Sequence, residues 1–211
     1  MIKKILNEIF PSGCIICGKI YKNAICPQCY NFIKQDVVFE YIKEKNFKLY
    51  YLTKYEKQIR KILLKFKFSD RPDIHLFFSE IISKKINIVE KIKEYDYIIP
   101  VPMHIIQCKK RGYNQAELIA NIIGKEHGIR VLNDILVKNK NNERQSGLNK
   151  KDREKNLNNV YEITKKEILE NKKILIIDDI YTTGNTISEC RKTILKGKPK
   201  IVDALVLAKR N

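Results

Sequence analysis

The sequence predicts an α/β fold in which helices flank a mainly parallel β-sheet. Two observations predict the sheet. From Tyr95 onward, short apolar runs alternate with amphipathic segments, as in strand–helix units. The run KILIIDD is continuously apolar, which is typical of a strand buried on both faces of a parallel sheet. A third observation, two CxxC pairs near the start of the chain, adds a small cysteine module in front of this domain.

The 211 residues are expected to form three parts. Residues 1–36 are a zinc-binding module, residues 37–93 are a helical segment that is a candidate hood, and residues 94–211 are the main α/β domain. A chain of this length supports one main domain with a sizeable core and leaves room for an appendage.

The cysteine module is predicted from Cys14, Cys17, Cys26 and Cys29, two CxxC pairs eight residues apart. Two such pairs on tight turns place four sulfurs around a zinc ion at about 2.3 Å. Disulfides are the alternative, and a cytoplasmic chain disfavours them. Four thiolates leave no open position for water, so the predicted zinc is structural.

The segment that follows the cysteines is predicted to be helical over residues 54–92. In YEKQIRKILLKFKF, the apolar residues Ile59, Ile62, Leu63 and Phe66 share one helix face. A second helix is expected in DRPDIHLFFSEIISKKINIVEKI, where a proline stands near the start.

The main domain is predicted to alternate strands and helices. Asn114 is the expected N-cap of one helix, which Gly128 ends. The segment 129–138 is either one strand or a short strand pair, and the polar segment 138–158 is a long loop. The other strands are expected at 96–102, 173–179 and 200–208, and the helices at 114–128 and 186–197.

The stretch KILIIDDIYTTGNTISEC carries the clearest chemical signal. Asp178 and Asp179 stand at the carboxyl end of a predicted strand, the edge where open α/β sheets bind ligands. The loop after them leads into a helix whose free N–H groups favour an anion, and Gly184 allows a tight turn. The hydroxyl donors are Thr182, Thr183 and Thr186. A sugar phosphate fits both halves of the stretch, with phosphate in the loop and hydroxyls on the carboxylates.

Three alternatives compete with this interpretation. A Walker B strand also ends in acids, but the chain has no GxxxxGK[ST] loop to accompany it. A receiver domain carries an aspartate pair earlier in its sheet. The plainest alternative is a strand, a turn and a helix with no ligand.

The composition is strongly basic, with 42 Lys and Arg against 24 Asp and Glu and a formal charge of +18. Such a balance suggests a polyanionic partner. The alternative is compositional, because abundant Lys, Ile and Asn also follow from an A/T-rich genome. No apolar run approaches the roughly 20 residues that span a bilayer, so we expect a cytoplasmic protein.

The segment ILIIDDIYTTGNT resembles the signature of the type I phosphoribosyltransferases, which bind phosphoribosyl pyrophosphate (PRPP). Three further blocks narrow the resemblance: KYEKQIRKILLKFKFSD, IIPVPMHIIQCKKRGYNQAELIA and RQSGLNKKDREKNLNNVYEI. Together with the CxxC pairs they are similar, over nearly the whole chain, to the ComF family and its ComFC-type competence proteins. The fold that this implies is type I phosphoribosyltransferase-like.

The resemblance also implies a role for each matching residue. Asp178 and Asp179 would receive the ribose 2′ and 3′ hydroxyls and act as the catalytic residues, and magnesium would arrive with PRPP. The 5′-phosphate would lie on Thr182, Thr183, Gly184, Asn185 and Thr186. The pyrophosphate would lie on the turn of Pro102, Met103 and His104, under a mobile basic loop with Lys110 and Arg111.

Two functions stay open at this point. ComF proteins are linked to natural transformation, which implies a PRPP-binding protein that handles incoming single-stranded DNA, with competence-machinery proteins at the inner membrane face as partners. The candidate DNA contacts are Lys61, Lys65, Lys67, Arg144, Lys150, Lys151 and Arg153. The alternative is an active phosphoribosyltransferase that moves ribose 5-phosphate from PRPP to a nucleobase-like acceptor.

Overall fold

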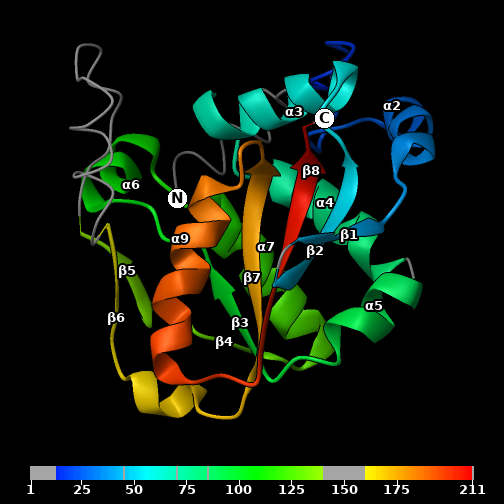
Figure 1. The fold of residues 1–211 in the computed structure, drawn as a ribbon. Helices are drawn as coiled ribbons and strands as arrows, with labels where there is room; N and C mark the ends of the chain where they lie inside the picture. The colour runs from blue at the N-terminus through cyan, green and yellow to red at the C-terminus, as the bar shows by residue number, and fades with distance from the viewer. Residues whose placement is uncertain (1–12, 45, 70, 85, 140–159, 211) are drawn as a thin grey trace.

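The computed structural model describes residues 13–44, 46–69, 71–84, 86–139 and 160–210 (Figure 1). Its centre is a six-stranded sheet in the order β1-β2-β8-β7-β3-β4. Every neighbouring pair is parallel except β1 and β2. The strands are β1 (Glu40–Glu44), β2 (Phe47–Lys54), β3 (Tyr97–Pro100), β4 (Arg130–Val131), β7 (Lys173–Tyr181) and β8 (Ile201–Lys209). The predicted mainly parallel sheet is confirmed.

The remaining elements surround this sheet. The strands β5 (Leu136–Lys138) and β6 (Tyr161–Ile163) form a separate antiparallel pair. The α-helices are α2 (Pro27–Ile33), α3 (Lys57–Phe68), α4 (Ile74–Ser83), α5 (Ile86–Ile92), α6 (Ile105–Arg111), α7 (Gln115–His127) and α9 (Asn185–Ile194). Short 3₁₀ helices are η1 (Lys34–Asp36), η2 (Lys166–Leu169) and η3 (Leu195–Gly197).

Helices cover both faces of the sheet (Figure 1). Ile174 and Ile176 of β7 pack in the core that α9, β5 and β6 share, whereas Leu175 and Ile177 pack in the core that α4 and α7 share. Successive side chains of a strand point to opposite faces, and this alternation explains why β7 is apolar without interruption. The helix α3 lies across the edge at which β7 and β8 end.

The predicted elements of the main domain are found close to their expected positions. Asn114 is the N-cap of α7, where its Oδ1 accepts a hydrogen bond from the N–H of Ala116 at 3.1 Å, and Gly128 is the C-cap with φ 70°. Segment 129–138 contains two short strands, but they do not pair with each other, because β4 pairs with β3 and β5 pairs with β6. The helix after β7 begins at Asn185.

The description of residues 37–93 as a helical segment is wrong for its first part. Residues 40–54 form β1 and β2, and β2 extends the sheet by pairing with β8. Five consecutive residues of β2 are buried, because its alternating side chains pack in the cores on both faces of the sheet. The helical prediction holds from Lys57 onward, where Ile59, Ile62, Leu63 and Phe66 face the core as expected.

Among the described residues, no helix combines the length and the apolar character that crossing a lipid bilayer requires.

Candidate functional site

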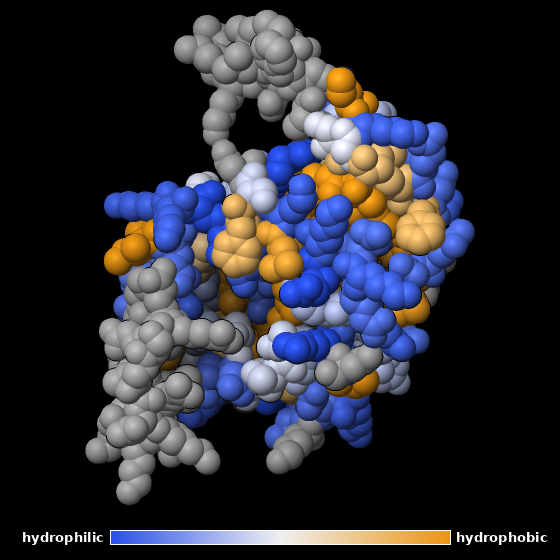
Figure 2. Space-filling view, turned by 90° about the horizontal axis from the view of Figure 1, so that it is seen from above, coloured by the Kyte–Doolittle hydropathy of each residue, from blue (hydrophilic) through white to orange (hydrophobic). Residues whose placement is uncertain are grey.

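A cavity of about 390 Å³ lies at the carboxyl ends of β3 and β7. The end of β7 contributes Asp178 and Asp179, and the end of α3 contributes Lys67. Figure 2 views the molecule from the side toward which these strands point, and hydrophilic side chains cover most of this face. The other lining residues used below are Tyr55, Pro102, Met103, Gln107, Arg111, Asn114, Gln115, Lys138, Tyr161, Thr182, Thr186 and Arg210.

The two aspartates occupy different faces of the sheet end. Asp178 continues the side of β7 that faces Cys190 and Tyr161, while Asp179 lies on the side of Arg111. Burial raises the pKa of Asp178 well above its usual value, and the charge of Asp179 adds to this shift. None of the ion pairs among the described residues involves either carboxylate. Burial therefore outweighs the Asp179 N–H and the charge of Lys67, which both favour the ionised form of Asp178.

Cations face the aspartates across the cavity. Burial lowers the pKa of Arg111, and the charge of Asp179 acts against this shift. Burial likewise lowers the pKa of Lys138, where Asp178 opposes the shift and Lys67 adds to it. A ligand that brings phosphate to the cations and hydroxyl donors or a metal ion to the carboxylates would relieve both shifts.

The loop after β7 positions hydroxyl groups at the start of α9. Gly184 is the N-cap of this helix in the left-handed region, and no side chain caps the first turn, which contains no acidic residue. The N–H groups of such a turn are available to an anion. Thr182 and Thr186 line the cavity, whereas Thr183 and Asn185 are exposed and lie outside its lining.

We predict that Gly184→Ala lowers both stability and ligand affinity. Gly184 has φ +77°, and an added Cβ would lie 2.4 Å from the Tyr181 Oη. That hydroxyl donates to Glu44 Oε1 at 2.8 Å, so the tyrosine cannot move without breaking this bond. The left-handed backbone alone costs a residue with a Cβ about 1–2 kcal/mol, and the clash adds to it. Chemical denaturation measures the loss of unfolding free energy.

The matched control is Gly128→Ala, at φ +70° with nothing within 4 Å of an added Cβ. It carries the backbone strain without the clash and lies outside the cavity lining. Equal losses of stability in the two variants, with unchanged affinity for PRPP, would contradict the role that we give to Gly184.

The predicted pyrophosphate turn is only partly at the cavity. Pro102 and Met103 line it. His104 instead caps α6, where its Nδ1 accepts from the N–H of Ile106 at 3.3 Å. Lys110 is exposed and outside the lining. The prediction of a basic loop at this position is wrong, because Lys110 and Arg111 form the last turn of α6.

The cavity also contains residues that sequence reasoning missed. Lys138 and Tyr161 face each other across β5 and β6, with the Lys138 Nζ 6.0 Å from the centre of the Tyr161 ring. Arg210 follows β8, and Gln115 begins α7. The signal for Gln115 was the block RGYNQ, whereas nothing in the local sequence distinguishes Lys138 from other lysines.

The candidate DNA contacts divide into two groups. Lys61, Lys65 and Lys67 lie on α3. Lys67 lines the cavity, and the Lys61 Nζ donates to the Ile16 carbonyl at 3.1 Å. The other candidates, Arg144, Lys150, Lys151 and Arg153, lie outside the described residues.

The four predicted metal ligands meet at one point. The sulfur atoms of Cys14, Cys17, Cys26 and Cys29 all lie within 4.8 Å of one another. The sulfurs of Cys17 and Cys26 are 3.8 Å apart, and bonds of about 2.3 Å to a tetrahedral zinc ion give a sulfur–sulfur distance of about 3.8 Å. The donor set and its spacing fit a metal ion such as zinc.

The backbone around the cluster favours the thiolate form of one cysteine, Cys14. Burial disfavours ionisation of Cys14, but the backbone N–H groups of Cys17, Cys26 and Ile16 outweigh it and lower its pKa to about 6. One of these donors, the N–H of Cys26, lies 3.4 Å from the Cys14 Sγ. Burial and the neighbouring thiols raise the pKa of Cys29 to about 12. A bound cation is what would allow all four to ionise together.

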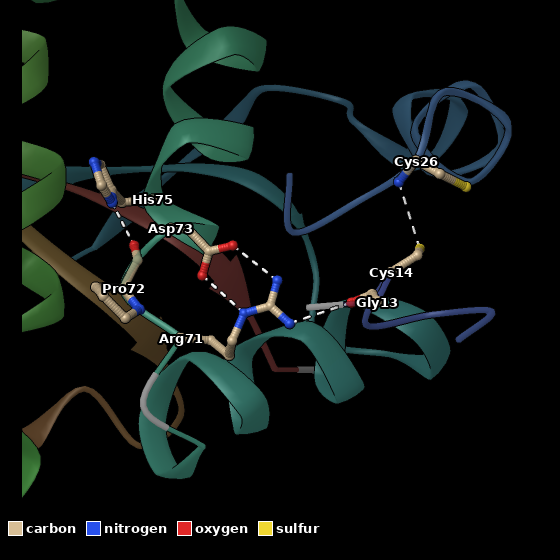
Figure 3. A network of polar contacts seen from close by, with 7 residues as sticks. All are labelled: Gly13, Cys14, Cys26, Arg71, Pro72, Asp73 and His75. Carbon is tan, nitrogen blue, oxygen red and sulfur yellow. Dashed lines mark hydrogen bonds and ion pairs between the residues drawn. The ribbon is translucent and has the colours of Figure 1, made fainter. Parts of the chain in front are cut away.

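The cysteine module is fixed to the helices beside it (Figure 3). Arg71 Nη1 donates to the Gly13 carbonyl at 3.3 Å, and its Nε and Nη2 each donate to Asp73 at 2.8 Å. His75 contacts the Pro72 carbonyl in the same segment. These bonds join the residue before Cys14 to the start of α4.

The fold and the cavity together define a class of protein. A parallel sheet whose central strand ends in two aspartates, followed by a threonine–glycine loop at a helix start, is a phosphoribosyltransferase-type arrangement. A family model described as phosphoribosyl transferase domain matches residues 76–211, and the chain belongs to this family.

The chain is also similar to relatives that are named as competence proteins. The chain is 29% identical over 210 residues to Competence protein ComFC of Bacillus subtilis, covering 98% of this chain and 80% of that protein. It is 35% identical over 107 residues to Competence protein F of Haemophilus influenzae, covering 50% of this chain and 47% of that protein, so this match spans about half the length of the relative. The predicted resemblance to the ComF family is confirmed.

Comparison with solved structures gives matches of low structural similarity. An adenine phosphoribosyltransferase from Thermoanaerobacter pseudethanolicus has 15% identity and a TM-score of 0.41, covering 85% of this chain and 98% of that one. A purine phosphoribosyltransferase from Pyrococcus horikoshii has 20% identity and a TM-score of 0.35, covering 57% and 67%.

Proposed function

We propose that the chain binds PRPP with magnesium in the cavity at the end of β7. The ribose hydroxyls would donate to Asp178 and Asp179, and the 5′-phosphate would accept from Thr182, Thr186 and the first N–H groups of α9. The pyrophosphate would lie beside Pro102 and Met103, near Arg111. Magnesium would be held mainly by ligand oxygens and water, as this ion usually is.

The observation that carries this proposal is the charge pattern of the cavity. Two carboxylates and several cations share one cavity, and the pKa of Asp178 is raised while those of Arg111 and Lys138 are lowered. A ligand with only phosphate would satisfy the cations alone. PRPP carries phosphates, hydroxyls and a metal ion, so it compensates both signs of charge.

The same proposal includes a structural zinc ion in the cysteine module. Four thiolates would close its coordination sphere, so the metal would stabilise the fold and take no part in the chemistry of the cavity. The helix α3 connects the cavity with this module, because its Lys67 lines the cavity and its Lys61 donates to the Ile16 carbonyl.

We also propose a role in natural transformation, because the relatives are named as competence proteins. In this role the protein works in the cytoplasm and handles incoming single-stranded DNA, with competence-machinery proteins at the membrane as partners. The formal charge of +18 and the lysines of α3 supply the cations that a DNA backbone attracts.

A catalytic transferase is the second candidate function, and the aromatic walls of the cavity favour it. Tyr55 and Tyr161 flank the space beside the aspartates, where a planar acceptor could stack. In the transfer, an acceptor nitrogen bonds to ribose C1, the C1–O bond breaks, and pyrophosphate leaves with the electron pair. The acceptor proton passes to water. Asp178 and Asp179 would stabilise the positive charge that develops on the ribose.

Fluorescence anisotropy of a labelled single-stranded oligonucleotide tests the DNA role. We expect saturable binding to the unmodified protein that weakens steeply as salt rises and that changes when PRPP and magnesium are added. In Lys67→Met, the slope of log affinity against log salt should fall by about 1. Lys125→Met, a change of an exposed lysine on α7 outside the cavity, is the control.

Absence of DNA binding at physiological salt would contradict DNA handling. The formal charge of +18 would then reflect amino-acid composition and not a nucleic-acid partner. Calorimetry with PRPP and magnesium is a separate measurement, so PRPP binding can hold even if DNA binding fails. Release of pyrophosphate only when a nucleobase is added would favour the transferase.

A further inference from the structure

The carboxyl end of α3 is held by two side chains from the start of α7. The Phe66 carbonyl accepts from the Tyr113 Oη at 2.6 Å and from the Gln115 Nε2 at 2.9 Å. A helix leaves its last carbonyls without partners inside the helix, so these donors replace the missing bonds. The next residue, Lys67, is thereby held at the cavity.

The oxygen of the Gln115 side-chain amide holds Arg111, a cation of the cavity. Gln115 Oε1 accepts from Arg111 Nη1 at 2.7 Å. Gln115 is 2% exposed, and both residues line the cavity. A flipped amide would turn its NH₂ toward a guanidinium, which has only donors, and its oxygen toward a carbonyl, which has only acceptors. The chemistry of the two partners therefore fixes the orientation of Gln115.

The residue between Tyr113 and Gln115 holds a third segment. The Asn114 Nδ2 donates to the Val101 carbonyl at 3.0 Å, just before the turn at Pro102. Three consecutive side chains of the block RGYNQ thus fasten α3 and the β3 turn to the start of α7. Gln115 additionally accepts a hydrogen bond from the charged Arg111 side chain in the cavity.

We propose that Gln115 is a positioning residue that directs the Arg111 guanidinium toward the phosphate groups of the ligand. The inference rests on the proposed binding of PRPP and names how one of its contacts is oriented. A long arginine side chain has many rotamers, and fixing it in one orientation costs conformational entropy. Together with its bond to Gln115, Arg111 lies 5.7 Å from the centre of the Phe68 ring and is attracted by the charge of Asp179. The Gln115 carbonyl selects one orientation before the ligand arrives.

The same residue joins the cavity to the cysteine module. The helix α3, whose end Gln115 holds, contacts that module through Lys61 and Ile16. Loosening α3 would therefore free one of the two partners that fix the Gln115 amide.

The experiment compares Gln115→Met with Tyr113→Phe in the full chain. Each variant removes one hydrogen bond to the Phe66 carbonyl, but only Gln115→Met removes the acceptor for Arg111. We expect calorimetric affinity for PRPP with magnesium to fall about 10-fold in Gln115→Met and less than about twofold in Tyr113→Phe, since a hydrogen bond to a charged group contributes more than a neutral one. Thermal denaturation should show that both variants fold and lose stability.

Two further variants separate positioning from structure. On an Arg111→Met background, Gln115→Met should have no added effect on affinity, because its effect passes through Arg111. Gln115→Glu keeps an acceptor for Arg111 and loses the donor to Phe66, but its added negative charge repels the phosphate groups, so both stability and affinity for PRPP should fall.

The outcomes distinguish the positioning role of Gln115 from the proposed binding of PRPP. Equal affinity losses in Gln115→Met and Tyr113→Phe, or additive losses with Arg111→Met, would overturn the positioning role and leave PRPP binding in place. Failure of the unmodified protein to bind PRPP would overturn the proposed function and this role with it.

Discussion

Replacement of both Asp178 and Asp179 by asparagine is expected to abolish PRPP binding while leaving the fold intact. Asparagine has nearly the same shape, but it carries no charge to accept the ribose hydroxyls or to face magnesium. A hydrogen bond to a charged group contributes about 1.5–3 kcal/mol, so the loss of two should weaken binding by at least about 100-fold. Calorimetry with PRPP and magnesium measures the change, and Asp134→Asn, an exposed site outside the cavity, is the control.

Stability provides a second readout of the same substitution. The folded-state pKa of Asp178 is raised by burial and by the charge of Asp179, so ionising this carboxyl costs stability as pH rises through the folded-state pKa. Asp178→Asn removes that cost. Its melting temperature should exceed that of the unmodified protein near neutral pH, and the advantage should vanish in acid, where Asp178 is protonated in both states. Unchanged PRPP affinity in the double variant would disprove the assignment of the ribose site.

Loss of zinc is expected to open the N-terminal module before the rest of the protein. Structural zinc contributes about 10–16 kcal/mol in small zinc-finger peptides, far more than the hydrogen bonds by which Lys61 and Arg71 join this module to its neighbours. In Cys26→Ser, or after chelation, hydrogen exchange of the amides in residues 14–36 should accelerate on the order of 10³-fold or more. The amides of β7 and β8 should keep their protection.

A matched control uses a cysteine outside the cluster. Cys108 is half-buried on α6 and does not belong to the group of four, so Cys108→Ser should leave both zinc content and exchange unchanged. Exchange in residues 14–36 that does not respond to chelation would argue against a structural metal.

Much of the main domain was predictable because its signals are local. The continuous apolar run of β7 requires burial on both faces, and Asn114 and Gly128 mark both ends of α7 through their own hydrogen-bonding and backbone preferences. The cysteine spacing likewise determines where four sulfurs can meet. In each case the residues on which the prediction is based are the same residues that form the predicted structure.

The features that were missed depend on distant partners. The strand β2 is stabilised by pairing with β8, about 150 residues away in the chain, and no local pattern encodes that partner. Lys138 reaches the cavity only because β5 and β6 pair beside α9. His104 matched the pyrophosphate turn in sequence, but the start of α6 uses its ring as a cap. Position in a motif did not decide what the side chain contacts.

The core that the cysteine module shares with α3 and α4 limits how the molecule can change. Ile15, Ile25 and Ile33 are buried in the same cluster as Ile62 and Phe78. A module that buries its apolar residues against its neighbour cannot be exchanged or discarded as a separate unit, because its removal would expose the helices beneath it to water. Substitutions on the two sides of this contact are therefore expected to be inherited together, so that the metal-binding part and the helices evolve as one piece.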